Sequence, residues 1–293
     1  MLAFALQDSI IKYLSQHYPI LQVLTLRSIV TLALLVVIGL SFFGAKVLIG
    51  RQHMLLMLRG GLAFFAFTSY YLALKLIPFG TAATVYMTAP LFVTLLSGLV
   101  LREQVGIHRW FAVLTGFAAV IIMLDPGSEL FRFESAIPLF SALCYAMIPI
   151  LNRRIGMSEH ALTMGIYTTA TYLSLISVTS LVFYALPIPV TANVSINALF
   201  QGWVWIALND IGILLVACVI FTGALLAITQ AYRIAIVSTI APFEYSYLLW
   251  AVLIGYLYFG EVPELRTLLG GATIVACGCY IIYRERQLAQ LKH

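Results

Sequence analysis

The chain has 293 residues, of which 62% are hydrophobic and only 9% carry a charged side chain. Soluble domains contain about 25% charged residues, so this composition, with its mean hydropathy of +1.03, excludes a soluble domain and predicts a polytopic membrane protein. In a membrane protein the net charge of +5 reflects how the basic residues are distributed between the two sides of the membrane, and it does not indicate nucleic-acid binding.

Ten apolar segments follow one another along the chain, so the predicted fold is all-α with ten transmembrane helices. A helix needs about 20 apolar residues to cross a bilayer, and most of the segments are about that long. The first segment is shorter and contains Asp8 and Lys12. The segments cover residues 1–15, 19–43, 54–75, 80–101, 108–124, 135–152, 161–186, 211–232, 235–259 and 265–283.

The connections between the segments are short, except for residues 187–210. This stretch is too polar, and too interrupted by proline at its start, to span the membrane. Trp203 and Trp205 predict that it lies at the membrane interface, where indole rings prefer to sit. A lid over a cavity is the alternative role for the same stretch.

The basic residues of the loops predict that both termini are cytoplasmic. With the N-terminus inside, eleven basic residues fall on the cytoplasmic side and three on the outer side, as the positive-inside rule requires. Acidic residues of the outer side include Glu261. The cytoplasmic basic residues are Lys46, Arg51, Arg59, Arg102, Arg109, Arg153, Arg154, Arg233, Arg284, Arg286 and Lys292, and the outer ones are Lys75, Arg132 and Arg266.

An internal repeat relates the two halves of the chain. Shifting the sequence by 158 residues superimposes segments three to five on segments eight to ten, without a gap. Because the halves are five segments apart, an odd number, the second half is inverted in the membrane relative to the first. The matching pairs are Ala73 with Ala231, Lys75 with Arg233, Thr81 with Thr239, Ala83 with Ala241, Leu95 with Leu253, Glu103 with Glu261 and Ala118 with Ala276.

Two inverted five-helix halves are typical of secondary transporters, which alternate access to a site at the midplane of the membrane. The same shift pairs Tyr86 with Glu244, so both are expected at the pseudo-two-fold axis. The predicted domains are a first repeat at 1–124, an outer connection at 125–134, a second repeat at 135–283 and a cytoplasmic tail at 284–293.

Glu244 is central to the functional prediction. It lies well inside the ninth segment, two residues after Pro242, whose missing amide donor loosens the helix there. A carboxylate near mid-membrane costs roughly 2.5–3.5 kcal/mol on insertion scales, so it normally faces a cavity or a partner. Glu244 is therefore predicted to bind the substrate or to carry a proton. The alternative is a structural residue that is protonated or paired with Arg27.

Three further charges lie inside apolar segments. Asp8 and Lys12 are four residues apart on one helix face, so they could form an internal ion pair or exchange with a charged substrate in a cavity. Arg27 lies about eight residues into the second segment. It could pair with Asp8, extend to the outer interface, or bind an anionic group of the substrate directly.

The sequence gives little support to an enzyme, a cofactor or a metal site. The five histidines are scattered through loops and ends without metal-ligand spacing, and neither a phosphate-binding glycine loop nor a GxSxG nucleophile motif is present. The four cysteines fall in apolar segments and are interpreted as small core residues. The chain is predicted not to be an enzyme and to bind no cofactor.

Two stretches resemble the drug/metabolite transporter superfamily, in its EamA-type branch of ten helices. They are YYLALKLIPFGTAATVYMTAPLFVTLLSGLVLREQVG at 70–106 and AYRIAIVSTIAPFEYSYLLWAVLIGYLYFGEVP at 231–263, each followed by a glycine-bearing segment. The opening, LQDSIIKYL and then LTLRSIV, is similar to the subgroup that includes bacterial riboflavin and S-adenosylmethionine uptake proteins. REQ at 102–104 departs from the family, which more often has glycine before the glutamate.

The resemblance implies a central cavity, which we expect segments one, two, three, four, six, eight and nine to wall. Tyr71, Tyr86 and Tyr245 lie on helices that it places around this cavity. They are predicted to contact the solute, since aromatic rings suit planar or cationic molecules. Gly60 and Gly61 are expected to allow close packing of helices instead.

The predicted function is secondary-active transport of a small organic metabolite across the bacterial inner membrane. A vitamin, a nucleoside-like or an amino-acid-like solute would fit. The expected partners are this solute, protons as a candidate coupling ion, and the lipid bilayer, with no nucleic acid and with the chain as a monomer or homodimer. An exporter of amino acids or of aromatic or cationic drugs is the alternative, and a non-transporting sensor or assembly subunit is a remote one.

Overall fold

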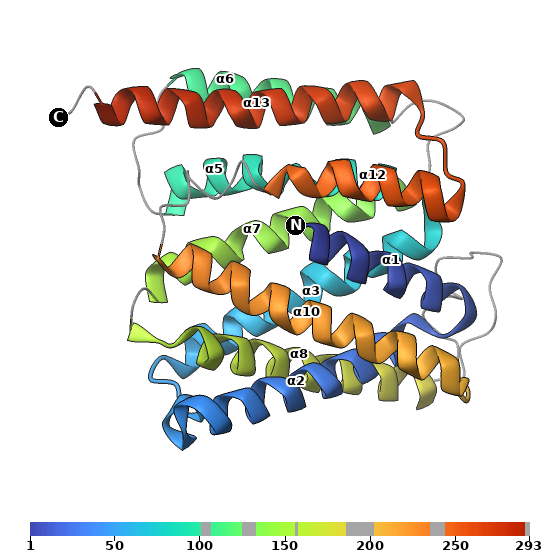
Figure 1. Cartoon of the computed structure of the whole chain (residues 1–293). Helices are drawn as coiled ribbons and strands as arrows, with labels where there is room; N and C mark the ends of the chain where they lie inside the picture. Colours follow the sequence, from blue (N-terminus) through green and yellow to red (C-terminus); the bar gives the residue numbers. More distant parts are fainter. Residues whose placement is uncertain (101–106, 125–132, 156–157, 186–201, 235–243, 291–293) are drawn as a thin grey trace.

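The computed structural model describes residues 1–100, 107–124, 133–155, 158–185, 202–234 and 244–290. Every regular element in this part of the chain is a helix (Figure 1), which confirms the all-α prediction. The elements are α1 (Leu2–His17), α2 (Ile20–Phe43), η1 (Ala45–Leu48), α3 (His53–Leu76), α4 (Phe79–Tyr86), α5 (Ala89–Val100), α6 (Ile107–Leu124), η2 (Phe133–Ala136), α7 (Ile137–Ile155), α8 (Ala161–Ala185), α10 (Leu208–Ile234), α12 (Ser246–Phe259) and α13 (Leu265–Gln290).

The apolar length of these helices makes the chain a multi-pass membrane protein. In the described part of the chain six stretches of helix are long and apolar enough to cross a membrane, and shorter apolar helices lie at Trp110–Ile122, Ser246–Phe259 and Leu265–Tyr280. α1 has 16 residues and carries the two charges of Asp8 and Lys12. Each of the ten predicted apolar segments therefore contains a helix.

The fourth predicted segment is a broken helix. α4 ends at Tyr86 and α5 begins at Ala89, with a turn at Met87 and Thr88 between them. Pro90 lies in the first turn of α5. Backbone amides of a first turn have no partner within the helix, so the missing amide of proline costs no hydrogen bond there. The break brings the last turn of α4 to the cavity described below.

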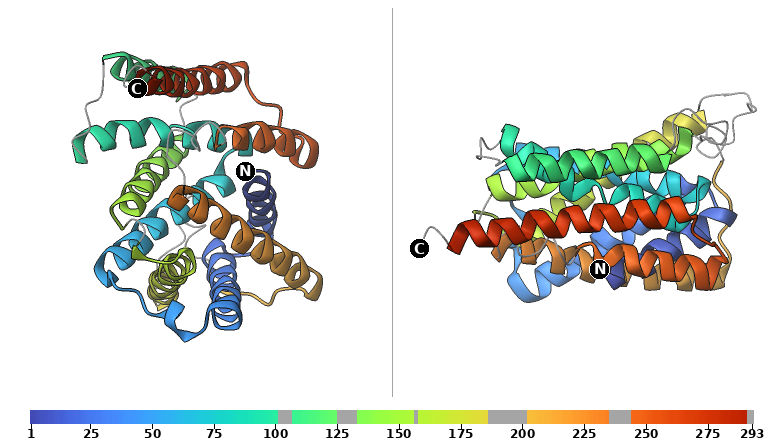
Figure 2. Two further views of the ribbon diagram at one scale, coloured as in Figure 1. Left: turned by 60° about the vertical axis from the view of Figure 1, so that its left-hand side comes forward. Right: turned by 90° about the horizontal axis from the view of Figure 1, so that it is seen from above.

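The helices form layers that appear in the same order in two orientations (Figure 1, Figure 2). α6 and α13 lie side by side along one edge of the bundle. α5 and α12 occupy the next layer, and the other long helices make up the remainder. The pair α6–α13 thus stands apart from the helices that enclose the interior of the bundle.

The two halves of the chain pack against each other in a reciprocal pattern. α3 of the first half packs against α7 and α8 of the second half, and α10 of the second half packs against α1 and α2 of the first. Likewise α5 packs against α7, and α12 packs against α1. The pattern is unchanged when α3 is exchanged with α10, α5 with α12, α7 with α1 and α8 with α2, as expected of halves related by a two-fold axis.

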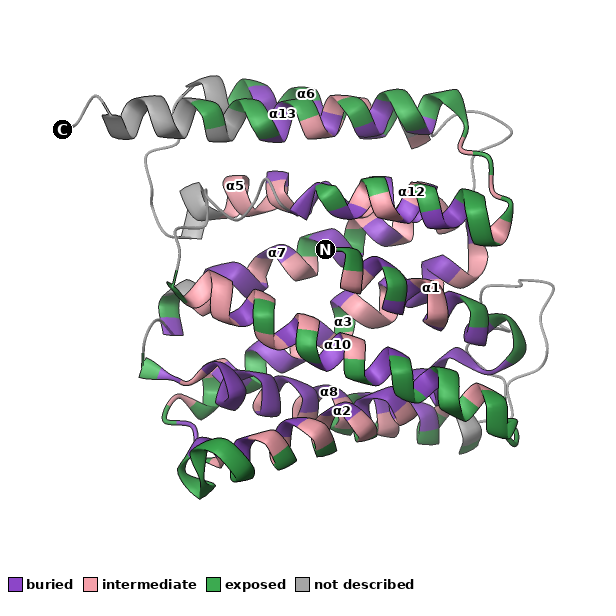
Figure 3. Cartoon of the chain, viewed as in Figure 1, coloured by how far each residue is buried: buried purple, intermediate pink, exposed green. Residues whose placement is uncertain are grey.

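Apolar side chains cover the outside of the bundle as well as filling its core. Exposed residues run along the outer faces of the helices (Figure 3). Among them Phe42, Met54 and Phe111 are 78%, 85% and 73% exposed. Such a surface would be unfavourable in water and suits the hydrocarbon core of a bilayer.

Part of the predicted interfacial segment can be placed. Residues 202–207 are not helical, Trp205 is fully exposed, and the indole of Trp203 donates a 2.8 Å hydrogen bond to the Ser180 hydroxyl on α8. Residues 186–201 lie outside the described part of the chain, as do 235–243 with Pro242 and 101–106 with Glu103. The interfacial location of this segment stays a prediction.

Candidate functional site

A cavity of about 90 Å³ lies between the helices of the two halves. Among the described residues α2 contributes nothing to its wall, contrary to expectation, because α2 packs behind α8 and α10. α8 instead contributes Thr168. The lining residues are Met1, Phe4, Asp8, Arg59, Ala63, Phe67, Tyr70, Tyr71, Tyr86, Met87, Ala89, Tyr145, Ile148, Pro149, Asn152, Thr168, Phe221, Leu225, Ile228, Thr229, Tyr232, Glu244 and Tyr247.

The cavity wall follows the internal repeat. Residues of α3 line the cavity, and the residues 158 positions later on α10 line it too. The same shift relates two further lining pairs, Tyr86 with Glu244 and Ala89 with Tyr247. The pairs on α3 and α10 are Ala63 with Phe221, Phe67 with Leu225, Tyr70 with Ile228 and Tyr71 with Thr229.

Glu244 lies in the wall of this cavity and is only 6% exposed. Its Oε1 atom accepts hydrogen bonds from two hydroxyls, that of Tyr145 on α7 at 3.3 Å and that of Tyr232 on α10. Among the described residues Glu244 takes part in no ion pair, so the alternative pairing with Arg27 is not formed. Neutral donors therefore orient this carboxylate and leave its Oε2 atom without a described donor.

Tyr86 joins the same part of the wall. Its ring packs between those of Tyr70 and Tyr145, with centroid distances of 4.7 and 5.5 Å. Since Tyr145 also donates to Glu244, the residue pair related by the repeat meets at one patch of the cavity. The structure thus brings Tyr86 and Glu244 together, while their contact with a solute stays a prediction.

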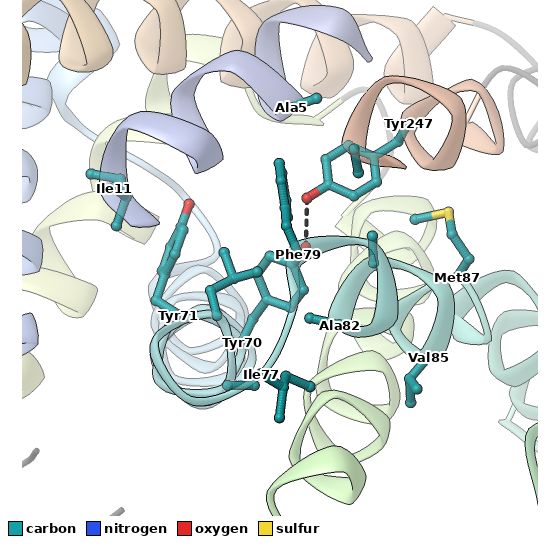
Figure 4. Packing of buried hydrophobic residues seen from close by; sticks show 14 of the residues in the cluster. Ala5, Ile11, Tyr70, Tyr71, Ile77, Phe79, Ala82, Val85, Met87 and Tyr247 are labelled. Atoms are coloured by element: carbon teal, nitrogen blue, oxygen red, sulfur yellow. Dashed lines mark hydrogen bonds between the residues drawn. The ribbon is translucent and has the colours of Figure 1, made fainter. Parts of the chain in front are cut away.

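Asp8 forms a second acidic point on the wall. It accepts hydrogen bonds from the hydroxyls of Tyr71 at 2.8 Å and Tyr247 at 2.6 Å, and from the amide of Gln7. The hydroxyls of Tyr70 and Tyr247 are 2.5 Å apart (Figure 4). Donors from α1, α3 and α12 therefore fix the position of the Asp8 carboxylate.

Arg27 is buried behind this group, at 2% exposure, and does not line the cavity. Its Nη1 atom donates to the Tyr71 hydroxyl at 2.7 Å and to Gln7 Oε1 at 3.3 Å. The guanidinium lies 4.4 Å from the ring centroid of Phe221 and 4.8 Å from that of Tyr71, a stacking that suits a weakly hydrated cation. Arg27 therefore reaches Asp8 through Tyr71 and does not extend to the outer interface.

The possible ion pair between Asp8 and Lys12 is replaced by another. Lys12 pairs with Glu261, with Nζ and Oε1 2.7 Å apart and the two side chains 5% and 21% exposed. Lys12 Nζ also donates to the carbonyl of Ile77 at 3.0 Å. Glu261 Oε2 accepts from the amide of Phe79 at 2.6 Å, the first amide of α4, which has no partner within its helix. Lys12 thus belongs to a contact between the halves and not to the cavity wall.

Tyr245 is placed away from the cavity. It is 5% exposed, and its ring packs against Gly278 of α13, where a Cβ atom would lie 2.0 Å from the Tyr245 hydroxyl. Tyr247, two residues later, occupies the cavity wall instead. The structure therefore does not bring Tyr245 together with the other predicted site residues.

Arg59 is a cavity residue that the positive-inside argument assigned to the cytoplasmic side. It is 3% exposed, and its Nε atom donates to Asn152 Oδ1 at 2.7 Å. Its Nη1 atom donates to the carbonyl of Met164 at 3.0 Å and to the hydroxyl of Thr168. The signal was present in the sequence, because Arg59, like Arg27, lies inside an apolar segment.

Three tyrosines of the site carried no comparable signal. Tyr145, Tyr232 and Tyr247 hold the two cavity carboxylates, yet the chain has 16 tyrosines, and helical spacing alone does not show which of them face inward.

Within the described residues, no group of three or more His, Cys, Asp or Glu side chains is placed to hold a metal ion. The wall therefore offers carboxylates, hydroxyls, a guanidinium and aromatic rings, which suit reversible binding of a small solute.

A bundle of apolar helices around a cavity with buried charges defines a class, the multi-pass membrane transporter. The model of the EamA-like transporter family matches residues 1–125. The chain is 32% identical over 302 residues to the riboflavin transporter of Vibrio cholerae, with 98% of this chain and 94% of the relative covered. The chain belongs to the EamA-like transporter family, within the drug/metabolite transporter superfamily.

One further relative agrees with this membership, and one solved structure shares the fold. The chain is 27% identical over 293 residues to the S-adenosylmethionine uptake transporter of Rickettsia prowazekii, with 99% of this chain and 92% of the relative covered. A protein of known crystal structure, 19% identical, superimposes with a TM-score of 0.59 over 98% of this chain and 96% of its own length. The second comparison supports the fold alone.

Proposed function

We propose that this transporter moves a small organic metabolite across the bacterial inner membrane by alternating access. Its relatives include bacterial proteins named for riboflavin and for S-adenosylmethionine transport. A vitamin, a nucleoside-like solute or an amino-acid-like solute is the class that these names and the aromatic cavity wall favour.

The observation that carries the proposal is the buried carboxylate of Glu244 in the cavity wall. A charge removed from water is costly, and membrane proteins retain one inside the bilayer mainly where it binds a substrate or a proton. Only hydroxyls from Tyr145 and Tyr232 reach Glu244 among the described residues. A cationic group or a proton that binds the carboxylate would satisfy it better than these neutral donors do.

The neighbouring residues have proposed roles that follow from their contacts. The rings of Tyr86 and Tyr71 line the cavity and would stack on the solute. Asp8 and Arg27, linked through the Tyr71 hydroxyl, form a charge network that can adjust when the solute displaces a hydrogen bond. Lys12 holds the two halves together at one end through Glu261.

Alternating access is supported by the relation between the halves. The reciprocal helix packing and the equivalent lining positions on α3 and α10 fit two inverted repeats, at 1–124 and 135–283, around one site. Rocking one repeat against the other would open the cavity to each side in turn. The distribution of basic loop residues favours cytoplasmic termini.

Export of amino acids or of aromatic or cationic drugs is the second candidate, because tyrosine rings and two carboxylates in one wall also suit organic cations. Counterflow measured in right-side-out and inside-out vesicles separates the two directions. Accumulation of the labelled solute only in right-side-out vesicles supports uptake, and accumulation only in inside-out vesicles supports export.

The test of the proposed site is uptake into proteoliposomes that contain the purified chain. Radiolabelled S-adenosylmethionine and riboflavin are offered to the wild type, to Glu244→Gln and to Glu264→Gln, whose glutamate is exposed in the loop before α13. We expect Glu244→Gln to lower uptake of the accepted solute at least about tenfold, and Glu264→Gln to leave it unchanged. Normal uptake by Glu244→Gln would contradict the proposed role, provided that both variants elute and melt like the wild type.

A further inference from the structure

Arg59 is the basic residue of the described cavity wall, opposite in sign to the carboxylates of Glu244 and Asp8. Its three hydrogen bonds end on neutral acceptors, the Asn152 amide, the Met164 carbonyl and the Thr168 hydroxyl. Among the described residues Arg59 takes part in no ion pair with an acidic side chain. A guanidinium that is 3% exposed therefore lies in the wall without a described counter-charge.

The two charges do not neutralise each other. On α7, Asn152 binds Arg59 and Tyr145 binds Glu244. These two contact residues are seven positions apart, which is about 10 Å along a helix axis. Arg59 and Glu244 are thus held at different heights of the same cavity by one helix.

We propose that Arg59 binds an anionic group of the transported solute, and that Glu244 binds a cationic group of the same molecule. The solute is then one that carries both charges, separated by several bonds, with a carboxylate as the natural partner of the guanidinium. This inference rests on the proposed transport function and narrows its substrate class.

The aromatic rings beside Glu244 fit such a solute. Tyr86 and Tyr145 lie 5.5 Å apart in the wall beside Glu244, where aromatic faces stabilise both a planar group and a neighbouring cation. A neutral solute would cover Arg59 and Glu244 without offering either of them a counter-charge. That cost disfavours neutral molecules even where their shape fits.

The experiment compares three adenosyl probes of different charge. The first two differ only in the carboxylate, and the third also lacks the aminopropyl chain. S-Adenosylmethionine carries a carboxylate and cationic groups, its decarboxylated form carries cationic groups only, and 5′-methylthioadenosine is neutral. Equilibrium binding of each probe, and of riboflavin, is measured on the purified full chain and on Arg59→Gln and Glu244→Gln. Arg51→Gln is the matched control, because Arg51 is exposed and lies just before α3, at the end that carries Arg59.

We expect the wild type to bind S-adenosylmethionine most tightly and 5′-methylthioadenosine most weakly. Arg59→Gln should weaken binding of S-adenosylmethionine about tenfold and leave the decarboxylated form within about twofold of the wild type, because only the former offers a carboxylate. Glu244→Gln should weaken both charged probes. Arg51→Gln should change none of these affinities.

Three outcomes would overturn the inference. Equal weakening of all probes by Arg59→Gln would show that Arg59 only ties α3 to α7 and α8. Wild-type binding of the neutral probe as tight as that of S-adenosylmethionine would remove the need for two charges. Binding of riboflavin but of no adenosyl compound would do the same. Each of these leaves transport itself standing, whereas a chain that binds its probe but carries nothing into proteoliposomes would refute the proposed function.

Discussion

The hydroxyl of Tyr71 joins two buried charges that do not form a direct ion pair. It accepts from Arg27 at 2.7 Å and from Gln7 at 2.6 Å, and it donates to Asp8 at 2.8 Å. A phenolic oxygen can donate once and accept twice, so all of its capacity is used. The side chain is 2% exposed, and water cannot easily take over these bonds.

Replacing Tyr71 by Phe should therefore destabilise the protein by about 1–3 kcal/mol, because buried donors and an acceptor lose their partner. Thermal unfolding of the detergent-purified variant measures the effect. Tyr258→Phe is the matched control, since Tyr258 is 82% exposed and should tolerate the loss of its hydroxyl. Equal stability of the two variants would show that the Tyr71 hydroxyl contributes little to the network.

At this scale the sequence predicted the burial of several charges better than it predicted how they pair. Asp8, Lys12, Arg27 and Glu244 stand out because each lies inside an apolar segment. Their partners come from helices distant in the chain, as when Tyr247 donates to Asp8, and no local pattern specifies such a contact.

Close approach of α3 and α8 depends on one glycine of an adjacent pair. A Cβ atom added at Gly60 would lie 2.4 Å from Cβ of Thr171 on α8, whereas one added at Gly61 would meet nothing within 4 Å. The sequence favoured close packing at both positions, because the pattern of small residues does not tell which of two neighbours faces the other helix. The tertiary structure assigns that role to Gly60.

Alanine at these two positions gives a matched test. Gly60→Ala should destabilise the protein by about 1–3 kcal/mol, since the backbone of α3 or the side chain of Thr171 must move. Gly61→Ala should be neutral or stabilising by up to about 1 kcal/mol, because alanine favours the helix. Midpoints of thermal unfolding report both effects. Loss of stability in Gly61→Ala equal to that in Gly60→Ala would contradict the packing argument.

Over the whole molecule, one ion pair connects elements far apart in the sequence. Lys12 belongs to α1, while Glu261 lies between α12 and α13 and also binds the first amide of α4. Glu261 was expected as an acidic residue of the outer side and as the repeat mate of Glu103. The sequence predicts its side of the membrane but not its contacts. The two halves of the chain thus meet at this contact, which would have to break if they rocked apart at that end, as the proposed mechanism requires.

Lys12→Met should shift the protein towards an arrangement that is open on the side of Glu261, because removing one partner of a buried ion pair costs about 3–5 kcal/mol in the state that contains it. Ala251→Cys on α12, buried at 0% exposure, reports the opening in a background without the four native cysteines. An impermeant maleimide added outside should label this cysteine much faster with Lys12→Met than with Lys12 intact.

The control for this labelling is Val262→Cys, at a position 77% exposed, which should react from outside in both backgrounds. Unchanged labelling at residue 251 would show that the pair does not hold the halves closed, and reaction at residue 262 only from the cytoplasmic side would reverse the proposed orientation.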